Sequence, residues 1–133
     1  MTRWLSRIAC LLLLTTSVAC DTPPEERFAG ARSAAENKEL PAYMKFFTRR
    51  SAAFLRDMLA NGSRSKMVYL KDPFTLLPAG DVEEIVVDGN SALVKVKGQK
   101  GIEELVMLRE NDEWSIDLFS LAKFWQPMKE IGQ

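Results

Sequence analysis

The sequence predicts an α+β domain in which helices come first and an antiparallel sheet follows. Two patterns carry this prediction. Between positions 41 and 61, apolar residues recur at helical spacing. Between positions 82 and 119, four short apolar runs alternate with turns that contain glycine or asparagine, which is typical of a meander. We therefore expect a curved antiparallel sheet wrapped around the N-terminal helices.

Residues 1–19 have the layout of a secretory signal. Two arginines precede an apolar run at 8–14, and small residues lead up to Cys20. The segment resembles the bacterial lipobox, which implies that Cys20 is acylated and becomes the first residue of the mature chain. Ser17 stands where leucine is usual in that motif. Cleavage after Ala19 also suits an ordinary signal peptidase, which would leave the cysteine unmodified.

The expected organisation is a signal at 1–19, an acylated cysteine with a short tether and helix start at 20–27, and a single domain at 28–133. The signal removes two of the 18 basic residues, so 16 face 18 acidic residues and the mature formal charge is −2. This balance argues against nucleic acid as a partner, because phosphates demand a strongly basic surface. The apolar run of the signal is too short to span a bilayer.

Two helices are expected before the sheet. The first is expected to begin at Thr22 to Glu25, with Thr22 as its cap, and to run to about Asn37. The residue before Pro41 disfavours helical geometry, so a second helix should start there and end at Asn61. Its apolar residues are Tyr43, Phe46, Phe47, Phe54, Leu55, Met58 and Leu59.

The remaining elements follow from turns and prolines. Segment 63–80 is expected to be a connection with one short strand, because Pro73 and Pro78 exclude a long regular element. Leu121 to Ile131 is expected to form a short helix at one end of the sheet. The four strands are expected at Val82 to Asp88, Ala92 to Lys97, Ile102 to Arg109 and Trp114 to Phe119.

Three segments resemble the nuclear transport factor 2-like superfamily. They are Ala34 to Pro41 before the aromatic-rich helix, the hairpin Asp88 to Val94, and Trp114 to Leu118. The similarity covers roughly residues 28–124. It implies a cone, in which a bent sheet wraps around a long helix and encloses a cavity. Some members use the cavity for catalysis, others for ligand binding, and many only for assembly, so the fold does not select a function.

The chain contains no histidine. This removes the commonest general base, the usual serine–histidine triads and most catalytic zinc sites. The sequence also lacks a spaced calcium loop and a glycine-rich phosphate cradle. We therefore expect no catalytic residue, no metal site and no cofactor.

One candidate pocket comes from the aromatic residues. The superfamily's ketosteroid-isomerase branch sets carboxyls in an apolar pocket beside a tyrosine, which makes Tyr43, Phe47, Asp117 and Phe119 candidate lining residues. Strand alternation places Asp117 either in the cavity or on the outer face of the sheet. The aromatic residues also suffice as the ordinary core of a small domain.

Three basic residues are candidates for a surface contact. Lys45, Arg49 and Arg56 are spaced to share one helical face. Such a stripe is either a solvated outer face or, close to a lipid anchor, a contact with an anionic membrane surface.

The sequence thus predicts a lipid-anchored protein of the bacterial cell membrane, facing the periplasm or the cell exterior. Its domain is expected to act as a non-catalytic binding or assembly module. The alternative is a carrier of small apolar ligands or an isomerase-like enzyme that uses the cone. The expected partners are the membrane, an envelope protein or a small apolar ligand, and a second copy bound through the sheet.

Overall fold

The computed structural model describes residues 21–60 and 72–122. It has the predicted α+β class, with helices preceding an open antiparallel sheet. The helices are α1 (Pro24–Glu36), α2 (Leu40–Met44) and α3 (Arg49–Ala60), and the 3₁₀ turns are η2 (Pro73–Thr75) and η3 (Leu118–Ser120). The strands are β1 (Val82–Asp88), β2 (Ser91–Gly98), β3 (Gly101–Glu110) and β4 (Glu113–Asp117).

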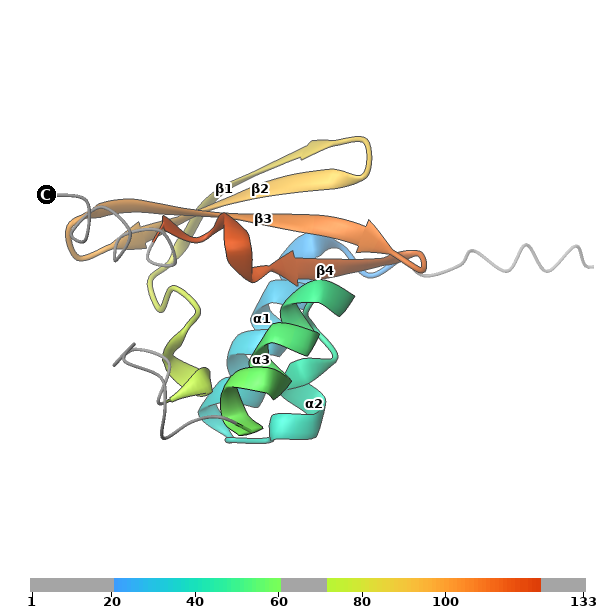
Figure 1. Ribbon diagram of the computed structural model, residues 1–133. Coiled ribbons are helices and arrows are strands. Elements are labelled where there is room, and N and C mark those ends of the chain that lie inside the picture. Colours follow the sequence, from blue (N-terminus) through green and yellow to red (C-terminus); the bar gives the residue numbers. More distant parts are fainter. Residues whose placement is uncertain (1–20, 61–71, 123–133) are drawn as a thin grey trace, which may run out of the picture.

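The sheet is a meander of four strands in the order β1-β2-β3-β4, and every neighbouring pair is antiparallel. The three helices lie on one face of this sheet, and α1 and α3 run across the strand direction (Figure 1). The helices and the sheet therefore form two layers with the core between them.

Register assigns each strand residue to a face. Met107 pairs with Ala92 on one side and with Ile116 on the other, and all three are buried. The next row, Leu93, Val106 and Asp117, points to the opposite face because side chains alternate along a strand. The helix-facing residues of the sheet include Ala92, Val94, Val96, Leu105, Met107, Trp114 and Ile116. Trp114 and Ile116 thus share one face, as the alternation predicts.

Helix α1 closely matches the first predicted helix. Its predicted inward residues Phe28, Ala31 and Ala35 are all buried. The predicted cap is wrong: Pro23, not Thr22, occupies the N-cap position, and no side chain caps this end. The proline at the start of the helix lacks an N–H, so one of the donors that a cap would satisfy is absent.

The predicted second helix is two helices. After α2, the chain straightens at Phe47, which forms a parallel bridge to Ile116. The Ile116 N–H donates to the Phe46 carbonyl oxygen (2.8 Å), and the Thr48 N–H donates to the Ile116 carbonyl oxygen (3.0 Å). The Thr48 side chain then caps α3 by accepting from the Ser51 N–H. The break thus covers the outer edge of β4.

The four predicted strands are present, but the last one ends early. Past Asp117 the chain turns into η3, where the Leu118 N–H donates to the buried Ser51 hydroxyl oxygen (3.0 Å). The described part of the predicted 63–80 connection contains η2 and no strand, whereas residues 61–71 lie outside the described ranges. The predicted helix at Leu121 to Ile131 lies outside them from residue 123 onward.

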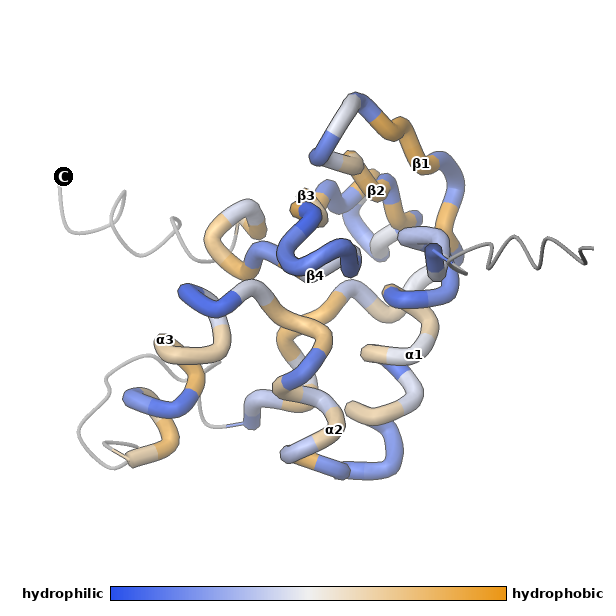
Figure 2. Tube along the Cα trace, turned by 90° about the vertical axis from the view of Figure 1, so that its right-hand side faces the viewer, coloured by the Kyte–Doolittle hydropathy of each residue, from blue (hydrophilic) through white to orange (hydrophobic). Residues whose placement is uncertain are grey.

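The two edges of the sheet differ. Among the described residues, the outer edge of β1 has no strand partner, and Val86 and Val87 are exposed by 44% and 53%. In Figure 2, β1 lies at the side of the sheet away from the helices, with hydrophobic residues in its middle. Only β1 therefore offers a free strand edge within the described part of the chain.

Candidate functional site

The residue that follows Cys20 in the sequence is bound to the domain. An Asp21 carboxylate oxygen, Oδ2, lies 2.7 Å from Nη2 of Arg109 near the end of β3. Both side chains are partly exposed, by 43% and 29%. The first residue of the tether is therefore attached to the sheet before α1 begins.

Arg109 is itself held on two sides. Its guanidinium lies over the ring of Trp114, 5.4 Å from the ring centroid. Its backbone N–H donates to the carbonyl oxygen of Asn90 in the β1–β2 turn (2.9 Å). Arg109 therefore joins the tether, the β3–β4 hairpin and the β1–β2 turn at one end of the sheet.

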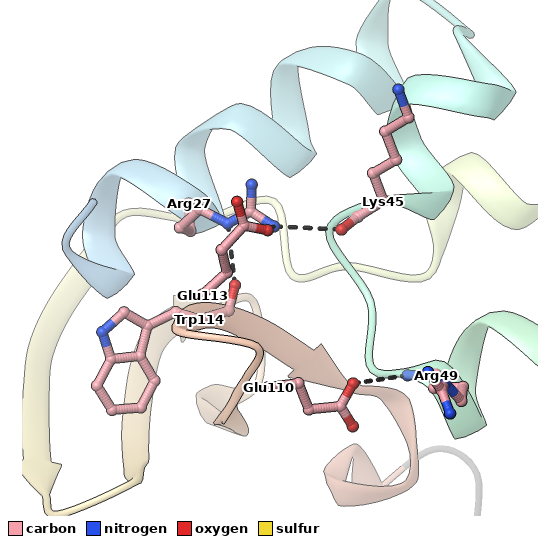
Figure 3. A network of polar contacts seen from close by, with 6 residues as sticks. All are labelled: Arg27, Lys45, Arg49, Glu110, Glu113 and Trp114. Atoms are coloured by element: carbon pink, nitrogen blue, oxygen red, sulfur yellow. Dashed lines mark hydrogen bonds and ion pairs between the residues drawn. The ribbon is translucent and has the colours of Figure 1, made fainter. Parts of the chain in front are cut away.

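Arg27 forms a second junction at the same end, shown in Figure 3. Its Nε donates to the Trp114 carbonyl oxygen (2.9 Å), and its Nη2 donates to the Lys45 carbonyl oxygen (3.2 Å). Its guanidinium also lies 4.5 Å from the centroid of the Phe46 ring. A longer ion pair at 3.9 Å connects it to Glu113 in the β3–β4 hairpin. Arg27 therefore joins α1, β4 and the segment after α2.

Glu110 completes this network. Its carboxylate oxygen Oε2 accepts from the backbone N–H of Arg49 (2.9 Å), at the start of α3. A carboxylate at this position stabilises a helix, because it meets the unsatisfied N–H groups and the positive end of the dipole.

The predicted basic stripe is not one helical face. Lys45 precedes α3, whereas Arg49 and Arg56 belong to it. Arg56 lies seven residues further along α3, which is about 10 Å of helix rise. All three residues are exposed, and Lys45 and Arg49 enter the network of Figure 3 through their backbone atoms.

Two surface hollows lie at opposite ends of the sheet. The hollow beside Asp21, of about 710 Å³, is lined by residues 21–22, Arg27 and residues of the β3–β4 hairpin. The far-end hollow, of about 820 Å³, is lined by parts of segment 75–81 and by the β2–β3 hairpin. Arg32 of α1 donates to the carbonyl oxygens of Pro78 and Gly80 in that segment.

The four candidate pocket residues are divided between two places, and none of them lines either hollow. Tyr43 and Phe47 are buried in the core, and their rings meet edge to face at 4.7 Å. The Tyr43 hydroxyl donates to the Pro73 carbonyl oxygen (2.7 Å). Burial, and to a smaller extent the negative charge of Asp72, raises the pKa of Tyr43 well above its ordinary value. The hydroxyl therefore stays protonated.

Asp117 is the last residue of β4, and Phe119 lies in η3. Register places Asp117 opposite Val106, on the sheet face away from the helices. Its Oδ1 accepts from the Phe119 N–H (3.0 Å), and its carbonyl oxygen accepts from the Ser120 hydroxyl (2.6 Å). The Phe119 ring contacts Phe54 at 5.2 Å. This carboxylate thus caps η3, and the described contacts do not bring it to Tyr43.

The sequence did not predict the polar network at this end of the sheet, which consists of Asp21, Arg27, Arg109, Glu110 and Glu113. One signal was available for Arg109. Arg109 falls on the same face of its strand as the apolar residues Leu105 and Met107. A charged residue on such an inward face needs a partner. The identity of that partner, 88 positions earlier in the chain, was not readable from local pattern.

Within residues 21–60 and 72–122, histidine, cysteine and acidic side chains form no cluster that could bind a metal ion. The helices of the same ranges are all too short or too polar to cross a membrane. Comparison of the chain with protein-family models, curated proteins and solved structures finds no match.

Proposed function

We propose that the protein is a lipid-anchored protein of the bacterial cell membrane, facing the periplasm or the cell exterior, whose domain binds or assembles with other molecules without catalysis. The signal layout and Cys20 support the anchor. The observation that carries the proposal is the attachment of Asp21 to Arg109, because it leaves no free linker between the anchored residue and the domain. Such a protein works at the membrane surface.

The interior of the domain supports binding through outer surfaces. Tyr43, Phe28, Leu105 and Met107 are buried between the helices and the sheet, and the two hollows lie at the ends of the sheet. Packed apolar side chains stabilise a domain of this size but leave little room for a substrate. The expected partners are an envelope protein or a second copy bound through the sheet.

For the finer fold we propose a nuclear transport factor 2-like cone. The resemblance rests on Ala34 to Pro41, Asp88 to Val94 and Trp114 to Leu118. It is compatible with an antiparallel meander whose one face is covered by the N-terminal helices.

The anchor is tested by replacing Cys20. In the native envelope, the unaltered protein should partition with membranes and carry acyl chains in its intact mass, whereas Cys20→Ser should move to the soluble fraction. Cys10→Ser is the matched control, because Cys10 lies in the signal and its loss should change nothing. Equal membrane partition of the Cys20→Ser and unaltered proteins, or an intact mass without acyl chains, would contradict the proposal.

A second candidate function is a carrier of small apolar ligands or an isomerase-like enzyme. It is favoured by the buried, protonated Tyr43 hydroxyl beside the rings of Phe47 and Phe74. Titration with dodecanoate, followed by amide NMR shifts, separates the two functions. Saturable shifts around Tyr43 and Phe47 would favour the carrier or enzyme, and shifts confined to the surface would favour the binding module.

A further inference from the structure

The connection between the proposed anchor and the domain is very short. Residues 21–23 alone separate Cys20 from α1, and Pro24, the first residue of the helix, is buried. Three extended residues span about 10 Å at most. An anchored domain therefore stays within about one helix diameter of the lipid surface, and only its orientation is left to be set.

The contacts of Asp21 restrict that orientation. Its ion pair with Arg109 fixes the tether to one end of the sheet, and the Trp114 ring and the Asn90 carbonyl oxygen hold Arg109 in place. Arg27 adds a second connection between α1 and the same hairpin through the Trp114 carbonyl oxygen. In Figure 1 the segment before α1 accordingly runs beside the β3–β4 turn.

This end of the sheet is the common end of two turns. The β1–β2 turn at Gly89 and Asn90 and the β3–β4 turn at Asn111 and Asp112 both lie there, because consecutive strands are antiparallel. The β2–β3 turn is at the opposite end, separated by the length of β3. At about 3.3 Å per residue, the ten residues of β3 span about 30 Å.

We infer that Asp21 and Arg109 form a clamp that orients the domain, with the β1–β2 and β3–β4 turns against the lipid surface and the β2–β3 turn directed away. The inference rests on the proposed acylation of Cys20. The clamp turns the far-end hollow toward the space where an envelope partner would approach.

The charges at the end of the sheet with the β1–β2 and β3–β4 turns indicate which kind of lipid surface this end would meet. The turns carry Asp88, Asp112 and Glu113, all exposed. Such carboxylates are repelled by anionic lipid and are compatible with zwitterionic headgroups. Lys45 and Arg49 are also exposed near this end, so the inference is that the clamp, and not their attraction to anionic lipid, sets the orientation.

The experiment uses the mature, acylated protein in zwitterionic nanodiscs that contain a phospholipid with a nitroxide headgroup. Amide NMR then measures how strongly the nitroxide enhances relaxation at each residue. We expect strong enhancement at Asn90 and Asn111 and weak enhancement at Gly98 and Gly101. Equal enhancement at both ends, or the reverse pattern, would overturn the inference.

Variants separate the clamp from other causes. Arg109→Gln should lower the contrast between the two ends at least about twofold, because releasing the pair admits other orientations. Exchanging the charges in Asp21→Lys with Arg109→Glu should restore the contrast. Lys100→Gln, at the opposite hairpin, is the matched control and should leave it unchanged. An unchanged contrast in Arg109→Gln would overturn the clamp.

Two further arms keep the outcomes distinct. Adding anionic lipid should not change the pattern of relaxation enhancement. An orientation seen only with anionic lipid would instead be due to basic residues such as Lys45 and Arg49.

If Arg109→Gln unfolds the domain, Asp21→Asn replaces this variant, because it changes only the tether. If the native protein lacks acyl chains, the proposed function fails. Coupling the Cys20 thiol to a maleimide lipid then still decides the clamp.

Discussion

The Arg27 guanidinium donates from Nε to the carbonyl oxygen of Trp114 over 2.9 Å, and this bond joins α1 to β4. The Arg27 side chain is only 15% exposed, and it also donates to the Lys45 carbonyl oxygen. One side chain therefore satisfies two backbone acceptors on different parts of the chain, so the main role of Arg27 is to stabilise the fold.

Arg27→Met should lower the free energy of unfolding by about 1–3 kcal/mol, because two carbonyl oxygens lose their donor. Arg56→Met is the control, since Arg56 is an exposed arginine of α3 and its loss should stay within about 0.5 kcal/mol. Urea denaturation of both variants measures the difference. Equal stability of the two variants would contradict the role of Arg27.

Trp114→Ala should cost about 3–5 kcal/mol, because the Trp114 side chain is buried and its removal leaves a cavity between the sheet and the helices. Ile102→Ala provides the comparison on the neighbouring strand. Ile102 is 55% exposed, so its truncation should cost well under about 1 kcal/mol. Chemical denaturation decides the point, and a loss below about 1 kcal/mol for Trp114→Ala would place this ring at the surface.

Ser51→Ala should cost about 1–3 kcal/mol, because the Leu118 N–H loses its acceptor in a buried site and the Thr48 hydroxyl loses a partner. The control is Ser33→Ala, an exposed position of α1 where alanine favours the helix. In both thermal and urea unfolding, Ser51→Ala should be less stable than the unaltered protein, and Ser33→Ala should be equally or more stable. A neutral Ser51→Ala would mean that the α3–η3 junction contributes little.

Tyr43→Phe should lower stability by about 1–2 kcal/mol at neutral pH, because the Pro73 carbonyl oxygen loses its donor. The pH dependence supplies a second test. Since the pKa of Tyr43 is raised on folding, its contribution is intact below the unfolded value of about 10 and is lost as pH rises above it. The expected slope is about 1.4 kcal/mol per pH unit.

Unfolding of both proteins at pH 8 and at pH 11 measures this slope. The difference in stability between the unaltered protein and Tyr43→Phe should shrink at the higher pH. A difference that stays constant would contradict the buried, protonated hydroxyl.

The strands were predictable because their signals are local. Alternation of apolar residues and turns such as Asn111–Asp112 depend on neighbours in sequence, and both of these residues adopt positive φ, as a tight hairpin turn requires. The first helix was readable for the same reason. Its inward residues Phe28, Ala31 and Ala35 recur with the helical period and are buried.

The break between α2 and α3 was not predictable, because it depends on Ile116, about 70 residues later in the chain. Local spacing favours an unbroken helix through Phe47, but the backbone bonds to β4 outweigh that preference. The face of Asp117 was equally open, because alternation alone does not tell which side the helices cover. Register with Val106 resolves it.

The free edge of β1 has a geometric consequence for anchored chains. Two copies that pair antiparallel along β1 are related by a rotation that turns one of them end for end. One anchor would then lie at the far end of the joined sheet, about 20 Å or more from the lipid surface, since β1 has seven residues. A three-residue tether cannot span that gap. For chains anchored as we propose, a shared bilayer would therefore exclude this edge-to-edge pairing along β1, and a second copy bound through the sheet would have to contact a face of the sheet instead.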